Sequence, residues 1–335
     1  MGYDEVFKAV PSVVQALWRR SCVAVWFFLR KGQGRPMSPW SAFFFCHTGR
    51  PHVDFASADG PSRISELLPI LLLADEQDGL LLMLRAYFAD SGSHADSEIV
   101  TIGGVIGTRQ QWNDFDKRWK ALLAEPLPGK PKLRMFHLSH CNAQKGEFQG
   151  YSDAECDAAT HDFRQILIDC GLISTASSID KRAWDELIVG PKRDWLGDAL
   201  DVCVENCLTE TIKIAGPHPE GDQIAVIFDR GIWTPRLDSV TEGYTYPLGR
   251  PRIVTVTFSK VEDVPPLQGA DITATENYWH AIKTLRDGYG AQPRPHMRHY
   301  LTHMFAEGFL IDRARIIEMM PDIEAQMKTF STDGQ

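Results

Sequence analysis

"LRAYFADSGSHADSEIVTIGGVIG", residues 84–107, contains two apolar runs separated by a short polar stretch, and it sets the fold. Arg85–Asp90 is rich in residues that favour strands, and residues 98–107 are β-branched and almost entirely apolar, which is typical of a buried strand. Because the loop between them is short, we expect the two strands to pair as an antiparallel hairpin. The first strand ends in a carboxylate, Asp90, which raises the question of which other acids lie near it.

Helix and strand patterns alternate after the hairpin. Thr108 is expected to cap a helix whose apolar residues recur at spacings of three and four: Trp112, Phe115, Trp119 and Leu122. Ser152 and Glu155 form a capping box that begins a helix ending near Cys170. Further strands are predicted at 172–179, 223–228 and 252–258. Further helices are predicted at 181–188, 193–214, 267–285 and from Arg298 onward. This alternation predicts a mixed α/β domain around one sheet.

Residues 1–82 differ from the rest of the chain. The apolar run within "SVVQALWRRSCVAVWFFLRK" is only about ten residues long, which is shorter than the roughly 20 that span a bilayer. The next stretch is rich in Gly, Pro and Ser and is typical of loop or disorder. Met83 directly precedes the first strand, so we expect residues 1–82 to be an upstream extension of the reading frame. The alternative is a poorly ordered arm, and in both cases the folded domain is expected at 83–330.

The composition is ordinary for a folded protein, with 44% hydrophobic residues and a net charge of −9. The acidic balance argues against a general nucleic-acid coat protein but leaves room for a local basic groove. Seven scattered cysteines without a C-x-x-C pair indicate reduced thiols and a cytoplasmic location. Cys203 and Cys207 share a helix face and are expected in the core. Basic residues cluster between 109 and 134, where they either follow a phosphate backbone or form a solvated helix face.

Three acids are expected at the ends of elements: Asp90 and Asp229 close strands, and Asp271 lies in the first turn of the 267–285 helix. Strand ends bring their side chains to one edge of a sheet, which is the usual ligand site in α/β folds. Two carboxylates about 4 Å apart repel by roughly 4 kcal/mol, so a cation between them stabilises the group. Carboxylates suit Mg²⁺ or Mn²⁺, which can activate water. The competing interpretation is that each acid serves a turn or a helix dipole.

Two polar residues accompany these acids. Gln268 lies three residues before Asp271 on the same helix face, where it either orients a ligand or makes a cap contact. His137 is followed by His140 and Cys141, a spacing that fits zinc poorly, so a structural or catalytic histidine is preferred. The sequence contains no Gly-rich phosphate loop with a following Lys-Ser/Thr and no G-x-S-x-G motif. Acid and metal chemistry is therefore the leading expectation.

The chain resembles the bacterial and phage family catalogued as domain of unknown function 3800, over about residues 84–285. The matching stretches, in order, are "AYFADSGSH", "GGVIGTRQQWNDFDKRW", "FHLSHCNAQKGEFQGYS", "VIFDRG" and "PPLQGADITATENYW". The resemblance implies a ribonuclease-H-like fold, a central mixed sheet flanked by helices, and a metal-dependent nuclease activity. Matched by position, Asp229 and Asp271 fall on the acidic positions of the family, and His137 and Gln268 on its recurrent polar positions.

The chain departs from the family pattern at Ala89. Members usually carry two successive acids directly before Ser-Gly, and here the first of these two positions is an alanine. Since successive strand side chains point to opposite faces, Asp90 should point away from a site that residue 89 lines. The leading hypothesis is a nuclease with Asp90, Asp229 and Asp271 as ligands of Mg²⁺ or Mn²⁺ and water attacking phosphorus in line. The second is a catalytically impaired relative that binds nucleic acid or protein. The third is a hydrolase of small phosphoesters.

Overall fold

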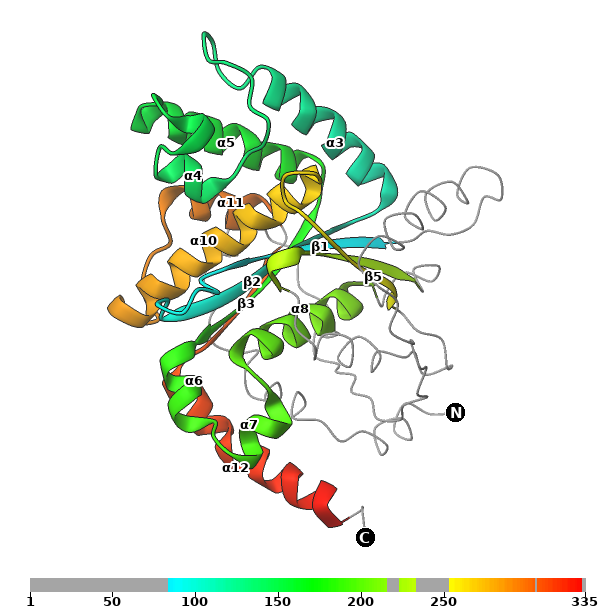
Figure 1. Cartoon of the computed structure of the whole chain (residues 1–335), viewed down its shortest axis with the longest axis vertical. Helices are drawn as coiled ribbons and strands as arrows, with labels where there is room; N and C mark the ends of the chain where they lie inside the picture. Colours follow the sequence, from blue (N-terminus) through cyan, green and yellow to red (C-terminus); the bar gives the residue numbers. More distant parts are fainter. Residues whose placement is uncertain (1–83, 216–222, 233–252, 305, 333–335) are drawn as a thin grey trace, which may run out of the picture.

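A mixed sheet of six strands forms the centre of the computed structural model, which describes residues 84–215, 223–232, 253–304 and 306–332 (Figure 1). The expected N-terminal extension at 1–82 and the expected start at Met83 lie outside these residues. The strands run in the order β5-β4-β1-β2-β3-β6. Their bounds are β1 Leu84–Ser91, β2 Ile99–Gly107, β3 Ile173–Asp180, β4 Ile224–Asp229, β5 Ile253–Ser259 and β6 Ala306–Ile311.

The expected hairpin is confirmed, because β1 and β2 pair antiparallel. β2 also pairs antiparallel with β3, whereas the β1–β4, β4–β5 and β3–β6 pairs are parallel. Among the strands described, β2 alone therefore runs against the others. The parallel strands β1, β4 and β5 end at the same edge of the sheet, which is where their terminal polar residues gather.

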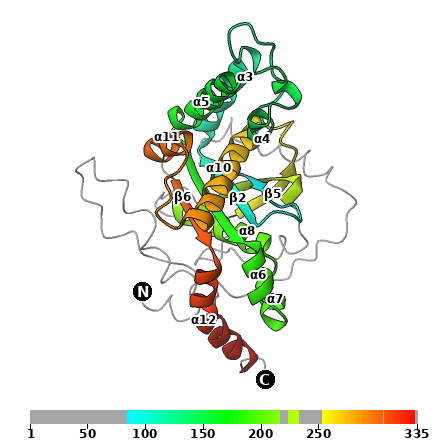
Figure 2. The same ribbon diagram turned by 90° about the vertical axis from the view of Figure 1, so that its left-hand side faces the viewer.

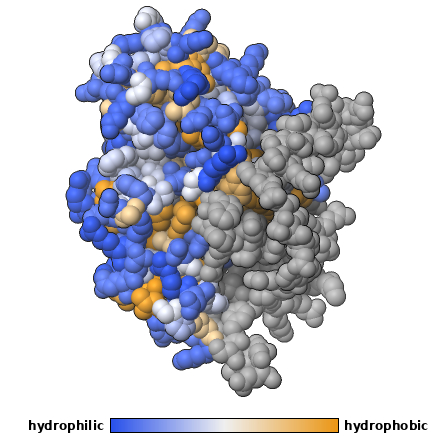
Figure 3. Space-filling model, in the orientation of Figure 1, coloured by the Kyte–Doolittle hydropathy of each residue, from blue (hydrophilic) through white to orange (hydrophobic). Residues whose placement is uncertain are grey.

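Helices cover both faces of this sheet, as the two orthogonal views show (Figures 1 and 2). One layer contains α3 Arg109–Ala124, α4 Leu138–Asn142, α5 Asp153–Asp169, α10 Pro265–Asp287 and α11 Pro295–His303. The other contains α6 Lys181–Leu187, α7 Pro191–Leu196, α8 Ala199–Ala215 and α12 Arg313–Thr332. The outer surface over the first layer is mostly hydrophilic in Figure 3, as expected of amphipathic helices. The expected α/β architecture, a central mixed sheet flanked by helices, is confirmed.

The helix starts follow their capping sequences. Thr108 accepts a hydrogen bond from the Gln111 backbone while the Gln111 side chain bonds back, and Ser152 and Glu155 make the same reciprocal pair. No helix among the described residues combines the length and the apolar character needed to cross a bilayer.

Alternation along β1 decides which residues face which helical layer. Tyr87 and Ala89 belong to the apolar cluster under α10, whereas Ala86 and Phe88 belong to the cluster on the α8 side. Cys203 and Cys207 are both buried on the α8 side, which confirms them as core residues.

Gly103 in β2 allows α10 to lie directly on the sheet. A Cβ atom at this position would be 2.3 Å from the backbone nitrogen of Ala274, a distance that no real Cβ contact shows. Because Gly103 pairs with Ala89 of β1, this close approach brings α10 onto the end of the sheet where the strand acids lie.

Three expectations were wrong. The region after Arg298 is not simply helical, because the short apolar segment Ala306–Ile311 forms the edge strand β6. The single helix expected at 193–214 is two helices, α7 and α8, separated at Gly197, whose φ is +83°. Asp271 is not in the first turn of its helix, because α10 begins at Pro265, two residues earlier than expected, with Pro at the first positions. The helix-dipole explanation for Asp271 therefore fails.

Candidate active site

Asp229 and Asp271 lie on the same side of the sheet. Asp229 is the last residue of β4, and the alternate residues Ala225 and Ile227 belong to the apolar cluster under α10. Asp271 lies in the second turn of α10 and is 5% exposed, and its neighbour Ala270 packs in that same cluster. Two acids that are far apart in the sequence thus lie on the same side of the sheet, close enough for their charges to interact.

The charges around Asp229 show that three acids come together. Burial raises the pKa of the Asp229 carboxyl, and the negative charges of Asp90 and Asp271 raise it further. Backbone amides of Arg230 and Val261 act in the opposite direction, and the Arg230 N–H donates to Asp229 Oδ1 at 2.8 Å. Burial is the largest cause of the net rise, and the two neighbouring negative charges add to it.

Asp271 is held by the segment before α4. Its Oδ2 atom accepts a hydrogen bond from the Leu138 backbone N–H at 3.1 Å and lies 3.1 Å from His137 Nδ1. No described residue donates to Asp271 Oδ1, so this oxygen remains available to a ligand. The contact joins α10 to a segment more than 130 residues earlier in the chain.

His137 is the titratable side chain in contact with Asp271. Burial lowers the pKa of this imidazole, but the hydrogen bond to Asp271 and the charges of Asp271, Asp229 and Asp90 outweigh it, so the pKa is raised overall. His140, whose ring stacks on His137 at 4.5 Å between centroids, has a lowered pKa because of its burial and the charge of His137. His137 is therefore the member of the pair that holds a proton more readily.

Asp90 lies at the margin of this group. Along β1, Ala86 and Phe88 face the α8 side, and Asp90 is the next residue in this alternation. The strand continues regularly through Ser91. A Cβ atom at Gly231 would be 3.2 Å from Asp90 Oδ1 and 3.8 Å from Asp229 Oδ2, so these oxygens are at most 7.0 Å apart. Gly231 thus leaves the space between the two acids clear.

Ala89 occupies the position that faces the site. It is 3% exposed in the cluster under α10. Tyr87 and Phe88 pair with Ile227 and Phe228, so the next residues in this register are Ala89 and Asp229. An acid at residue 89 would stand beside Asp229 on the same face, and here that position carries a methyl group.

Gln268 is fully engaged with the protein. Its Oε1 atom accepts from Trp119 Nε1 and from the Phe136 backbone N–H, both at 2.9 Å, and its Nε2 donates to Val261 O at 3.1 Å. These bonds tie α10 to α3, to the segment that carries His137, and to the loop after β5. We infer that Gln268 positions the surrounding segments, because its amide is taken up by these bonds.

The zinc interpretation of the histidines finds no support in the placement of Cys141. Its Sγ atom is buried beside Cys156 O and Thr160 Oγ1, both at 3.6 Å, and burial raises its pKa to about 12. A thiol held neutral in the core is a poor zinc ligand.

The basic cluster at 109–134 is largely neutralised. Its members form ion pairs with nearby acids: Arg118–Asp169, Lys120–Asp116, Lys130–Glu155 and Arg134–Glu147. These contacts support the solvated-surface interpretation over a dedicated phosphate track.

The carboxylate oxygens of Asp90, Asp229 and Asp271 are donors that fit a hard divalent cation such as Mg²⁺ or Mn²⁺. A cation would also relieve the repulsion that raises the Asp229 pKa. Among the described residues, however, no three His, Cys, Asp or Glu side chains are grouped closely enough to hold a metal ion as they stand. The donor chemistry therefore fits, while Ala89, which faces the same side as Asp229, supplies no ligand atom.

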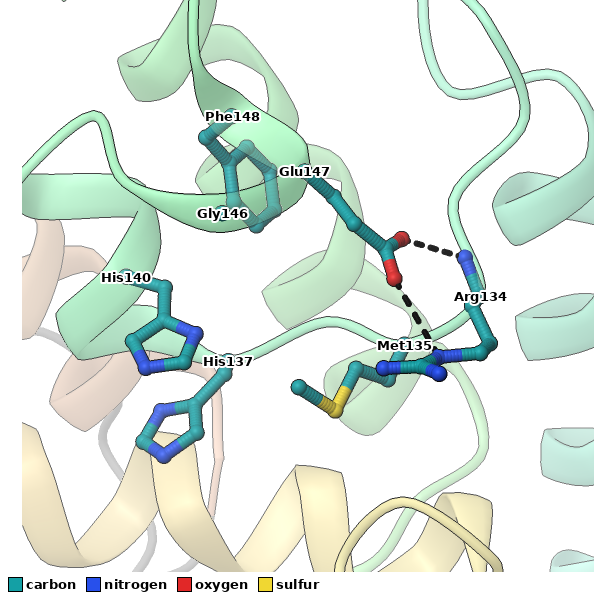
Figure 4. A pocket seen from close by; sticks show the side chains of 7 residues that line it. All are labelled: Arg134, Met135, His137, His140, Gly146, Glu147 and Phe148. Atoms are coloured by element: carbon teal, nitrogen blue, oxygen red, sulfur yellow. Dashed lines mark hydrogen bonds and ion pairs between the residues drawn. The ribbon is translucent and has the colours of Figure 1, made fainter.

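A shallow pocket of about 150 Å³ adjoins the acids through His137 (Figure 4). It contains none of the three carboxylates. Its lining residues are Arg134, Met135, His137, His140, Gly146, Glu147 and Phe148. Figure 4 shows the two imidazoles face to face on one side and Glu147 bonded to Arg134 on the other.

No family model and no curated protein matches the chain. Solved structures that it resembles include the PCNA–RNase HII complex from Archaeoglobus fulgidus, with 14% identity and a TM-score of 0.33 over 65% of this chain and 87% of that one. Another is Bst-RNase HIII in complex with Mn²⁺, with 11% identity and a TM-score of 0.36 over 74% of this chain and 72% of that one. Similarity this low says nothing about the activity of the present chain.

Three features of the site were not predicted from the sequence. The Leu138 N–H that bonds Asp271 is a backbone group, which no residue pattern marks. Gly231 was quoted within "VIFDRG" without a role, although a glycine two residues after a strand-terminal acid is a sign of close approach. The pocket beside His137 was also missed, because its lining depends on how residues 134–148 fold back.

Proposed function

We propose that the chain is a metal-dependent phosphodiester hydrolase, a nuclease, acting at the edge of the sheet where β1 and β4 end. The observation that carries the proposal is the placement of Asp90 and Asp271 near Asp229, whose pKa is raised by burial and further by these two negative charges. Negative charges that act on one another at a strand edge are stabilised by a bound cation.

Asp229 and Asp271 would hold Mg²⁺ or Mn²⁺, with Asp90 as a weaker third ligand. A bound divalent ion lowers the pKa of water and stabilises the charge that develops on a phosphoryl group. Asp271 also holds the His137 imidazole through Nδ1, which leaves Nε2 outside this contact. The acidic neighbours of His137 raise its pKa, so this imidazole is suited to donate a proton to the departing oxygen. Gln268 holds α10 against α3 and against the segment that carries His137.

A second function is favoured by one observation, the alanine at position 89. Ala89 lies beside Asp229 on the site face, where an additional acid would be expected to bind metal. Its absence favours a relative with weak or no catalysis that binds nucleic acid, or a protein, through the same surface.

Cleavage of labelled single- and double-stranded DNA and RNA in Mn²⁺ tests the proposal. We expect the wild-type protein to cleave at least one of these substrates, and expect Asp229→Asn combined with Asp271→Asn to abolish cleavage. Asp263→Asn is the matched control, because this exposed acid lies in the neighbouring loop before α10. Cleavage that persists in the double variant would defeat the assignment. Cleavage that appears only after Ala89→Asp would favour the second function.

A further inference from the structure

The pocket beside His137 has the size of a single flat ring. Its volume is about 150 Å³. A cavity of about that size accommodates one benzene ring in another protein. The pocket is also partly open to solvent on the side of Arg134 and Gly146, both of which are exposed. A ring that enters from a flexible chain can therefore reach it without moving the fold.

The walls of the pocket suit stacking. The His140 ring lies nearly parallel to that of His137, with an interplanar angle of 20°. Met135 lies on the opposite side in Figure 4, and the buried Phe148 ring forms part of the wall. Histidine, aromatic and thioether groups are surfaces on which unpaired bases stack. Gly146, whose Cβ would be 3.7 Å from His140 Nδ1, keeps the edge of that ring uncovered.

Arg134 offers hydrogen-bond donors at the rim of the pocket to the phosphate that accompanies a base. Glu147 holds Arg134 through both its backbone N–H and its Nε, which fixes the guanidinium while leaving its terminal nitrogens unused by this pair. In Figure 4 these terminal nitrogens extend toward Met135 at the pocket rim. The terminal nitrogens of Arg134 thus offer hydrogen-bond donors to a phosphate oxygen of a sugar–phosphate backbone.

We infer that this pocket holds the unpaired base of a nucleotide next to the phosphodiester bound at the acids, so that the substrate is single-stranded at that point. The inference rests on the proposed function, because His137 belongs both to the pocket wall and, through Asp271, to the acidic site. A base within a duplex is paired and stacked, and it would have to leave the helix to enter.

The test measures binding of a fluorescent single-stranded oligonucleotide, an abasic oligonucleotide of the same length and the matching duplex, by anisotropy in EDTA. Using the Asp229→Asn/Asp271→Asn protein prevents cleavage and reduces repulsion of the phosphates. We expect His140→Ala to weaken binding of the normal single strand by about fivefold or more and to leave binding of the abasic strand unchanged. His140→Phe should restore binding, because it keeps a flat ring. His94→Ala, in the exposed β1–β2 loop, is the control.

Three results would overturn the inference. The first is that His140→Ala lowers the affinity for normal and abasic strands equally, and the second is that it changes neither affinity. The third is that the duplex binds as tightly as the single strand. Absence of measurable binding to any strand would overturn it as well. Failure of this inference and failure of the proposed function give different results. A protein that does not cleave in Mn²⁺ can still lose affinity for the normal strand, and not for the abasic strand, in His140→Ala. Conversely, a protein that cleaves in Mn²⁺ but whose binding of the base does not depend on His140 would refute the base pocket. The proposed hydrolase activity would still stand.

Discussion

Restoring an acid at position 89 is the change that should alter the site most. Ala89 is buried beside Asp229 on the face under α10. In Ala89→Asp a second carboxylate would stand next to Asp229 without any new positive partner. We expect the metal-free variant to be less stable than Ala89→Asn, which has the same shape and no charge.

The size of this effect follows from strand geometry. Adjacent strands lie about 4.8 Å apart, so the carboxylates of residues 89 and 229 would be about 5 Å apart. At an effective dielectric constant near 20, two unit charges at that distance repel by about 3 kcal/mol. If a divalent ion cancels this repulsion on binding, the Kd for Mn²⁺ should fall about 100-fold relative to Ala89→Asn.

Urea unfolding in EDTA, followed by calorimetric titration with Mn²⁺, measures both quantities. The expected result is an Ala89→Asp protein that is less stable than Ala89→Asn without metal and binds Mn²⁺ more tightly. The steric cost of a larger buried side chain is common to both variants, so it cancels. Equal stability in EDTA together with equal Mn²⁺ affinity would refute the placement of residue 89 beside Asp229.

Three other outcomes are expected. Gly103→Ala should lower the free energy of unfolding by about 1–3 kcal/mol in urea, because its Cβ meets the Ala274 backbone, whereas Gly290→Ala, with open space around it, should not. Gln268→Leu should lower the free energy of unfolding by about 1–3 kcal/mol for each of the two buried N–H groups, of Trp119 and Phe136, that lose their acceptor. His137→Gln should lose more stability near pH 6 than near pH 9. The folded-state pKa of His137 is raised, so its contribution is full below its ordinary value of 6.5 and is lost as pH rises through the raised value.

Much of the fold could be predicted because local signals agree with the tertiary structure. The capping pairs at Thr108 and Ser152 mark helix starts, and the apolar runs of β2 and β4 mark buried strands. The strand β6 was missed because Ala306–Ile311 is a short edge segment between helices, with too few residues for a clear period.

The acids of the site could be named from the sequence, but their relative placement could not. Strand alternation predicts that Asp90 faces away from residue 89, and the structure places its neighbours on the α8 side. The contact of Asp271 with His137 depends on how residues 133–137 cross the start of α10, which no local pattern encodes. The bridging amide of Gln268 depends on the same tertiary contact.

Calorimetric titration of the metal-free protein with Mn²⁺ tests most directly whether Asp229 and Asp271 form a metal site. The measurement compares the wild-type chain, Asp229→Asn/Asp271→Asn and the loop control Asp263→Asn. We predict saturable binding by the wild type and the control and its loss in the double variant. Binding of Mn²⁺ by the double variant with the affinity of the wild type would contradict the proposed metal site.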